Sequence, residues 1–290
     1  MAGMTREQLI AHIIEKARLM RLYSLDMALV AGSNGAHLGP GYSMAEITAT
    51  LYFGVMRHDP ENPRWPERDR VILSKGHGVL GYYTALAESG YFPIDMLKNF
   101  ETKDSPLAGH PSMDLDLGIE ASTGSLGHGL SIAVGLALAA RMDQKDYVTY
   151  VLMGDGECNE GMVWESVMAA RQFQLDNIVA IIDRNLLQSD GVSRDIMDLG
   201  NLAEKWRSFG WHVNEVEGHD VGQLLDALHY RSRPKGSPYA IIAHTVKGKG
   251  VSFFENDNAW HHAKLTMEQY RLAKVELEMA AEGGNAKCSP

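Results

Sequence analysis

The second half of the chain alternates short apolar runs with segments of helical spacing. The apolar runs lie at 148–153, 178–183, 211–217 and 239–244, and the helix-like segments between them lie at 160–174, 200–209 and 220–232. Strands separated by helices of this length pair in parallel, because each helix returns the chain to the same end of the sheet. The pattern predicts an α/β fold, a central parallel sheet with helices on both faces.

The first part of the chain is predicted to be mainly helical. Thr5 and Gln8 have the spacing of a capping box, and the residues after them keep helical spacing to about Val30. The glycine-rich stretch 31–42 is predicted to be a loop, and another helix is expected to start near Ser43.

Three further segments frame the predicted sheet. Residues 71–78 (VILSKGHG) indicate a buried strand and a turn that leads into a helix. Residues 107–129 and 247–263 are predicted loops, and long loops without regular structure are often functional. A final helix is expected after Thr266, with Gln269 as its capping partner.

Composition narrows the class of protein. The 290 residues carry a net charge of −10, which argues against a nucleic-acid-binding protein because such proteins need a basic face. The two cysteines, Cys158 and Cys288, argue against a disulfide framework or a thiolate zinc site and indicate a reducing compartment. The charged N-terminus resembles neither a signal peptide nor a membrane span. A cytoplasmic protein without membrane association is expected.

Two polar side chains follow consecutive predicted strands. Asp155 stands in a Gly-Asp-Gly after 148–153, and Asn185 follows the run 178–183. Ligands of open parallel sheets bind at the carboxyl ends of strands, and a carboxylate with a neutral oxygen suits Mg²⁺, which fills its shell with phosphate oxygens and water. A plain turn or a helix cap at either position is the alternative. No G-x-G-x-x-G follows a strand and no P-loop motif occurs, which disfavours dinucleotide and P-loop nucleotide binding.

The motif around these residues resembles a known family. The pair GDGECNEG and DRNLLQSDG is similar to the thiamine-diphosphate signature, and the chain resembles the N-terminal half of transketolase. The likeness spans about 5–265 and continues through GAHLGPGYSMAEI, VILSKGHG, LAGHP, STGSLGHGLSIAVGLA and VKGKGVSFFENDNAWHH. It implies that residues 1–281 form a diphosphate-binding (PP-type) domain and that 282–290 form a disordered tail.

The resemblance also implies roles for individual residues. The magnesium ligands would be Asp155, Asn185 and the main-chain carbonyl of Leu187. The residues against thiamine diphosphate would be His77, Gly124, Leu126, Gly154, Asp155, Gly156, Glu157, Asn185 and His261. The catalytic residues would be His37, His77, His110 and His261, which face the sugar or the reacting carbon, and Glu160, which lies in a carboxylate pair between subunits.

The histidines and lysines leave alternatives open. Histidines from separate loops suit a phosphorylated, polyhydroxylated substrate, but any one of the twelve could be a loop residue bonded to nearby backbone. The structural alternative is favoured for His12, His58, His212, His219, His229 and His244. The KGKG at 247–250 is either an anion-contacting loop or a solvated basic turn, and Cys158 is interpreted as a packed residue.

Transketolases are roughly twice this length, and their second half holds the aminopyrimidine and supplies the glutamate that activates it. The resemblance therefore implies one subunit of a split transketolase, which transfers a two-carbon ketol unit between sugar phosphates only with a C-terminal partner, as an α2β2 heterotetramer. Alternatives are a subunit of a 1-deoxyxylulose-phosphate synthase-like or 2-oxoacid dehydrogenase-like enzyme, and a non-catalytic binding subunit.

The sequence departs from the family pattern near the expected pocket. The sequence HLGPG, which begins at His37, replaces the glycine run that is usual there. His128, His262 and Ser189 replace the residues that are common at their positions. These departures leave the substrate open, and a branched or sulfonated sugar is a further possibility.

Overall fold

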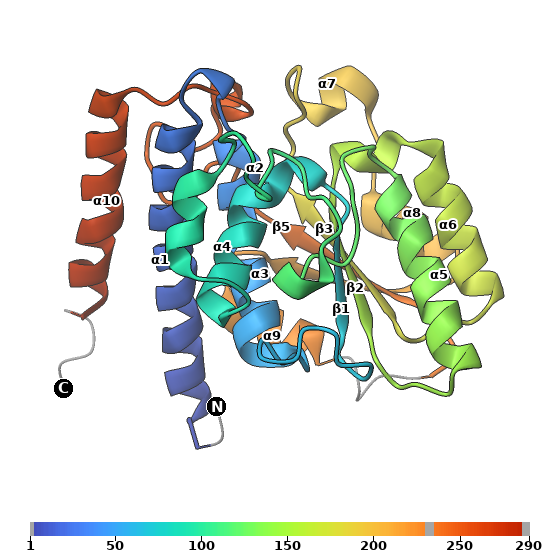
Figure 1. Cartoon of the computed structure of the whole chain (residues 1–290). Helices are drawn as coiled ribbons and strands as arrows, with labels where there is room; N and C mark the ends of the chain where they lie inside the picture. Colours follow the sequence, from blue (N-terminus) through green and yellow to red (C-terminus); the bar gives the residue numbers. More distant parts are fainter. Residues whose placement is uncertain (1–2, 230–234, 286–290) are drawn as a thin grey trace.

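The computed structural model describes residues 3–229 and 235–285, and it places five parallel strands in one sheet (Figure 1). The strands are β1 (Arg70–Leu73), β2 (Thr149–Gly154), β3 (Ile178–Arg184), β4 (His212–Glu217) and β5 (Tyr239–His244). Their order across the sheet is β1-β2-β3-β5-β4, and every neighbouring pair is parallel. The predicted α/β fold is confirmed, and each predicted apolar run lies within a residue or two of a strand.

Helices cover both faces of this sheet (Figure 1). The layer on one face consists of α1 (Arg6–Ala31), α2 (Leu38–Ser43), α3 (Ala45–Thr50), α4 (Val79–Ser89) and α9 (Val221–Leu228), and α10 (Met267–Asn285) packs on the outside of α1 (Figure 1). The other face packs against α5 (His128–Met142), α6 (Gly161–Gln172) and α8 (Leu202–Ser208). The short helix α7 (Ser193–Met197) lies at the carboxyl edge of the strands, at the top of the view (Figure 1).

Short helical turns complete the chain. They are η1 (Gly32–Asn34), η2 (Leu51–Val55), η3 (Gly76–Gly78), η4 (Ile94–Asn99), η5 (Leu115–Leu117), η6 (Gly156–Asn159) and η8 (Asn258–Trp260). The turn η3 comes shortly after β1, and η6 comes shortly after β2, so both turns lie at the carboxyl end of the sheet.

The two hydrophobic cores follow from the two-residue period of a strand. Along β3, Val179 and Ile181 belong to one core, whereas Ala180 and Ile182 belong to the other. All four are fully buried. A strand that is apolar on both faces cannot lie at the surface, which is why continuous apolar runs predicted a covered parallel sheet.

Two predictions about the ends of elements need correction. The stretch 31–42 is not all loop, because α2 runs through Leu38–Ser43. All six residues of α2 are buried, on the side of the hydrophobic core that contains Val179 and Ile181. Residues 282–285 of the predicted tail are helical, since α10 continues to Asn285, and residues 286–290 lie outside the described part. The helix α9 ends at Leu228, and residues 230–232 of the predicted helical segment lie outside the described residues.

The predicted helix starts are confirmed. Thr5 and Gln8 form a reciprocal capping box at α1, and Thr266 and Gln269 exchange the same pair of bonds at α10. Across the described residues, none of the helices combines the length and apolar character needed to cross a bilayer.

Candidate active site

All thirteen predicted site residues line one cavity of about 380 Å³ at the carboxyl ends of β1, β2 and β3. They are His37, His77, His110, Gly124, Leu126, Gly154, Asp155, Gly156, Glu157, Glu160, Asn185, Leu187 and His261. A second hollow of about 500 Å³ beside α7 shares Asp155 but contains none of the other twelve. The fold therefore brings together residues from across 225 positions of sequence, because the segments after the strands end at one edge (the span runs from 37 to 261).

Asp155 and Asn185, the two residues that suggested a cation site, lie at the carboxyl edge of the sheet, after β2 and β3. Asp155 is 5% exposed, and its two carboxylate oxygens accept hydrogen bonds from the amides of Leu186 (2.7 Å) and Gly156 (2.8 Å). Burial, and then the nearby charge of Asp183, raise the pKa of Asp155 to about 6. Asn185 is 8% exposed, and its Oδ1 accepts from the Leu187 amide at 3.1 Å. A divalent cation would offset the unfavourable charge on Asp155.

The chemistry of this donor set fits Mg²⁺ better than a softer metal. It offers one carboxylate and one amide oxygen, and Mg²⁺ prefers oxygen ligands and keeps several for water and phosphate. Throughout residues 3–229 and 235–285, no three His, Cys, Asp or Glu side chains are grouped to hold a metal ion. A metal here would therefore depend on oxygens from the bound anion as well as from the protein.

At the floor of the cavity the Gln188 side chain packs closely against the backbone of Gly156. A Cβ on Gly156 would lie 2.7 Å from Cγ of Gln188, so no larger residue fits there without displacing that side chain. Gln188 lines the cavity, and its buried Nε2 has no hydrogen-bond partner among the described residues. A buried amide donor without an acceptor is costly, and phosphate oxygens would satisfy it. These features fit the diphosphate end of thiamine diphosphate.

Two buried lysines line the same cavity; the sequence analysis missed Lys75 and left Lys247 open as part of KGKG. Lys75 is 1% exposed, donates to the carbonyl of Pro40 at 3.0 Å and pairs with the buried Asp183. Lys247, also 1% exposed, has Nζ 3.2 Å from the Gln188 carbonyl, 2.7 Å from Asn258 Oδ1 and 2.9 Å from His261 Nδ1. Burial, and then the charge of Lys75, lower the pKa of Lys247 to about 8. Both would attract an anion.

Of the two alternatives left open for KGKG, burial of Lys247 disfavours the solvated basic turn. Lys247 is buried, and only the side chain of Lys249 is substantially exposed, at 38%. The signal that could have identified both was their position, since Lys75 and Lys247 each follow the end of an apolar run by two or three residues. The same rule selected Asp155.

Five imidazoles gather at one wall of the site. The ring of His37 lies 5.5 Å from that of His77, 5.7 Å from His110, 5.5 Å from His261 and 4.4 Å from His262, centroid to centroid. Burial, and then the neighbouring imidazoles, lower the pKa of His37 to about 3. Burial and then Lys247 lower the pKa of His261 to about 4, and burial with Lys75 lowers that of His77 well below its usual range. These three rings are neutral at pH 7.

The two glutamates differ in setting. Glu157 is 2% exposed, and it accepts hydrogen bonds from Ser74 Oγ and from the amides of Gly127 (2.9 Å) and Gly154 (3.0 Å). Its carboxylate therefore holds the glycine turns in place. Glu160 is exposed at the rim, at the N-cap of α6. Cys158 is fully buried, and burial raises the pKa of its thiol, which fits the packed residue that the sequence indicated.

The departures from the family pattern lie at different depths. Ser189 lines the cavity, and its carbonyl accepts from Asn258 Nδ2 at 2.7 Å. His262 lies beside His37. His128 is exposed at the start of α5 and is not among the lining residues. Ser189 and Pro40 of HLGPG, which line the cavity, and His262, which lies beside His37, are therefore the departures placed to affect a substrate.

Comparisons with known proteins show what this chain is similar to. The family model described as transketolase, thiamine diphosphate binding domain matches residues 13–283. The chain is 43% identical over 268 residues to a 6-deoxy-6-sulfo-D-fructose transketolase subunit of a Clostridium species, covering 92% of this chain and 94% of that protein. It is 45% identical over 244 residues to an apulose-4-phosphate transketolase subunit of Actinobacillus succinogenes, covering 84% of this chain and 88% of that protein.

Among solved structures, the fold is similar to transketolase from Campylobacter jejuni, with a TM-score of 0.85 and 33% sequence identity. The match covers 93% of this chain and 43% of that one. The chain thus spans less than half the length of that enzyme, but nearly the full length of the two relatives named as subunits.

Proposed function

We propose, since this chain belongs to the transketolase family through its thiamine diphosphate binding domain, that it is the diphosphate-binding subunit of a two-chain transketolase. The reaction would move a two-carbon ketol unit from a ketose to an aldose acceptor in the cytoplasm. The observation that carries the proposal is the single cavity at the ends of β1 to β3, where oxygen ligands, buried lysines and neutral histidines meet.

The residues present suit a magnesium-bridged diphosphate. Asp155, Asn185 and the Leu187 carbonyl would hold Mg²⁺. The Lys247 ammonium, His77 and the unpartnered amide of Gln188 would face the diphosphate oxygens, and the backbone of Gly124 and Leu126 would face the aminopyrimidine ring. When bound, thiamine diphosphate supplies the carbanion equivalent that transfer of two carbons requires.

The neutral histidines would handle the sugar. An uncharged imidazole both accepts and donates one hydrogen bond, so His37 and His261 can hold sugar hydroxyls and carry a proton to or from them. His110 lines the same wall of the cavity and would face the sugar beside them. The depressed pKa values of His37 and His261 keep those two rings uncharged across the physiological range. This suits hydroxyl recognition better than direct pairing with a phosphate.

The relatives support a separate partner chain. Both are named as subunits, and this chain covers 94% and 88% of their lengths. The partner would supply the pyrimidine-binding domain in an α2β2 assembly, and Glu160, exposed in the single chain, would lie at the interface between the chains. The relatives' names, one a sulfo sugar and one a sugar phosphate, support a donor ketose that carries a terminal anionic group.

Reconstitution tests this function. The chain would be co-produced with the product of the neighbouring gene, and ketol transfer from sulfonated and phosphorylated ketoses would be measured together with release of CO₂. We expect transfer without CO₂, and none when the chain carries Asp155→Asn. Decarboxylation of a 2-oxoacid would instead place the chain in another class of thiamine enzyme, and full transfer by the isolated chain would remove the need for a partner.

A further inference from the structure

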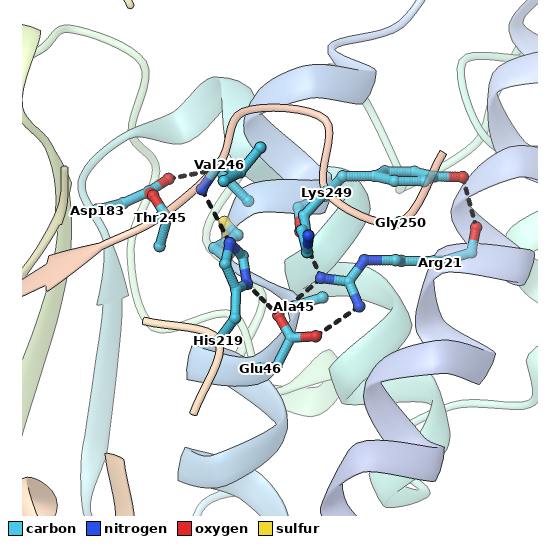
Figure 2. Close-up of polar contacts among 12 residues, drawn as sticks. Arg21, Ala45, Glu46, Asp183, His219, Thr245, Val246, Lys249 and Gly250 are labelled. Atoms are coloured by element: carbon cyan, nitrogen blue, oxygen red, sulfur yellow. Dashed lines mark hydrogen bonds and ion pairs between the residues drawn. The ribbon is translucent and has the colours of Figure 1, made fainter. Parts of the chain in front are cut away.

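A buried line of polar contacts connects α1 to the turn that follows β5 (Figure 2). It starts at Arg21 of α1, whose Nη1 and Nη2 each donate to a different carboxylate oxygen of Glu46 on α3 at 2.6 Å. The two side chains are 7% and 11% exposed. Burial alone would raise the pKa of Glu46, but the adjacent Arg21 and His219 outweigh it and hold the pKa at about 2. Glu46 is therefore a permanent acceptor.

His219, in the segment between β4 and α9, continues the line (Figure 2). Its Nδ1 lies 2.8 Å from Glu46 Oε2, and its Nε2 lies 2.8 Å from the amide nitrogen of Val246. A backbone N–H only donates, so Nε2 must be the bare acceptor and Nδ1 must carry the proton that goes to Glu46. The two partners thus select a single neutral tautomer of the ring.

Val246 stands between Thr245 and Lys247 in this turn. Thr245 donates its hydroxyl to the buried carboxylate of Asp183. Lys247 lines the cavity, with its ammonium held by the Gln188 carbonyl, Asn258 and His261, and its own carbonyl accepts from the Asn256 amide at 2.9 Å. Gly248 donates to the Gly39 carbonyl at 3.1 Å. The bond from Val246 to His219 fixes the backbone immediately before Lys247.

Arg21 supports the far end of the same turn. Gly250 has a φ of +100°, and a Cβ placed on it would lie 3.1 Å from Cδ of Arg21. The arginine therefore packs beneath Gly250 while its guanidinium holds Glu46. Because Arg21 already satisfies both Glu46 oxygens and also donates to the Tyr42 carbonyl at 3.0 Å, the ion pair does not need His219. The His219 imidazole is therefore not required for the ion pair, and it is the group that connects the pair to the turn.

We infer that His219 is a positioning residue: held by Glu46 and Arg21, it fixes the backbone at Val246 and so aims the Lys247 ammonium at the anion in the cavity. This inference rests on the proposed function, because the anion is taken to be a diphosphate. It assigns a role in binding to a side chain that itself lies outside the lining of the cavity.

Paired substitutions test which of the two imidazole nitrogens matters. A glutamine at this position places its amide oxygen near the site of Nε2 and can still accept from Val246, whereas an asparagine reaches only the Nδ1 site near Glu46. Inorganic pyrophosphate with Mg²⁺ is the probe, measured by calorimetry on the full chain. We expect His219→Asn to weaken pyrophosphate binding about tenfold and His219→Gln to retain most of the affinity.

Amide hydrogen exchange of residues 245–250 without any ligand provides a second readout. It should be faster in His219→Asn and close to wild type in His219→Gln. His212→Ala is the matched control, because that exposed histidine lies at the opposite end of β4. Equal affinity and equal exchange in the asparagine and glutamine variants would overturn the inference, because the contact with Val246 would then be irrelevant.

A double-mutant cycle with Lys247→Met separates this inference from the proposed function. If His219 acts through Lys247, His219→Asn should weaken pyrophosphate binding little or not at all once Lys247 is replaced. Additive losses would mean that His219 acts elsewhere, which would overturn the inference but leave the site intact. If Lys247→Met alone left pyrophosphate affinity unchanged, the assignment of the cavity to a diphosphate would fail instead.

Discussion

Asp155 and His37 show how burial prepares single residues for a ligand. Removal from water raises the pKa of the Asp155 carboxyl to about 6 and lowers the pKa of His37 to about 3, in each case by disfavouring the charged form. Binding of a cation would therefore stabilise the ionised Asp155 carboxylate, and His37 would remain neutral beside a polyhydroxylated ligand. Such opposed shifts in one cavity are characteristic of functional sites.

The first prediction concerns Asp155→Asn. The change keeps the size of the side chain and removes its negative charge, so affinity for thiamine diphosphate in the presence of Mg²⁺ should fall at least about a hundredfold. Calorimetry with and without Mg²⁺ measures it. Asp190→Asn, in the exposed loop that follows β3, is the control and should bind as the wild type does. Undiminished affinity in Asp155→Asn would refute the metal assignment.

A second prediction concerns pH. Folded His37 stays neutral to about pH 3, whereas the unfolded residue takes a proton near pH 6.5, so the unfolded state binds more protons as the pH falls. Stability is therefore lost on going from pH 7 to pH 5, by roughly 1–2 kcal/mol for this group. Urea unfolding should show a smaller loss in His37→Gln. His212→Gln should keep the wild-type loss, and identical pH dependence in all three proteins would contradict the pKa shift.

At the scale of the elements, Asp183 joins four segments at the carboxyl edge of the sheet. It lies at the end of β3 and is fully buried, and it accepts hydrogen bonds from Ser43 of α2 at 2.6 Å, from Lys75 after β1 and from Thr245 after β5. Burial raises its pKa, but the charge and hydrogen bond of Lys75 outweigh this effect, so the net shift is downward. Asp183 therefore holds α2, the segment after β1 and the segment after β5 in place beside the cavity.

The third prediction follows from this position. Asp183→Asn should lower the free energy of unfolding by about 3–5 kcal/mol, because it leaves the buried Lys75 ammonium without a counter-charge. Urea denaturation measures the loss. Adding Lys75→Met should recover part of it, since the unpaired charge is then gone. If the double variant were less stable than Asp183→Asn by the full effect of Lys75→Met alone, the two charges would not be coupled.

At the scale of the whole molecule, the cavity would contact only one end of the proposed cofactor firmly. Lys75, Lys247, the proposed magnesium ligands and Gln188 would surround the diphosphate, whereas this chain would offer only the backbone of Gly124 and Leu126 to the pyrimidine. The remaining contacts would come from the partner. The isolated chain should therefore treat thiamine diphosphate much as it treats inorganic pyrophosphate.

The fourth prediction compares these two ligands. With Mg²⁺, the isolated chain should bind them with affinities within about tenfold of each other, a difference of about 1.4 kcal/mol. Addition of the partner should strengthen binding of thiamine diphosphate and leave that of pyrophosphate nearly unchanged, because only the former reaches the second chain. Calorimetry on both samples measures it. Strong preference for thiamine diphosphate by the isolated chain would mean that the chain holds the pyrimidine itself.

Local pattern determined much of this protein. Apolar runs placed the strands, because a strand buried on both faces needs side chains that leave water at every position. The ends of those runs placed Asp155 and Asn185 at a shared edge, and family resemblance added the loop histidines that the structure finds beside them. These features depend on neighbouring residues in the sequence or on one topological rule, so they can be predicted from the sequence alone.

Tertiary structure alone decided what is distant along the chain. It placed β5 between β3 and β4, turned the glycine-rich stretch after Gly35 into the buried helix α2, and enclosed Lys75 and Lys247. It also joined His219 to Glu46 across 173 positions. The physical reason is that burial and hydrogen bonding depend on which surfaces meet, and no local pattern of residues states which distant segment will cover a given lysine or accept from a given amide.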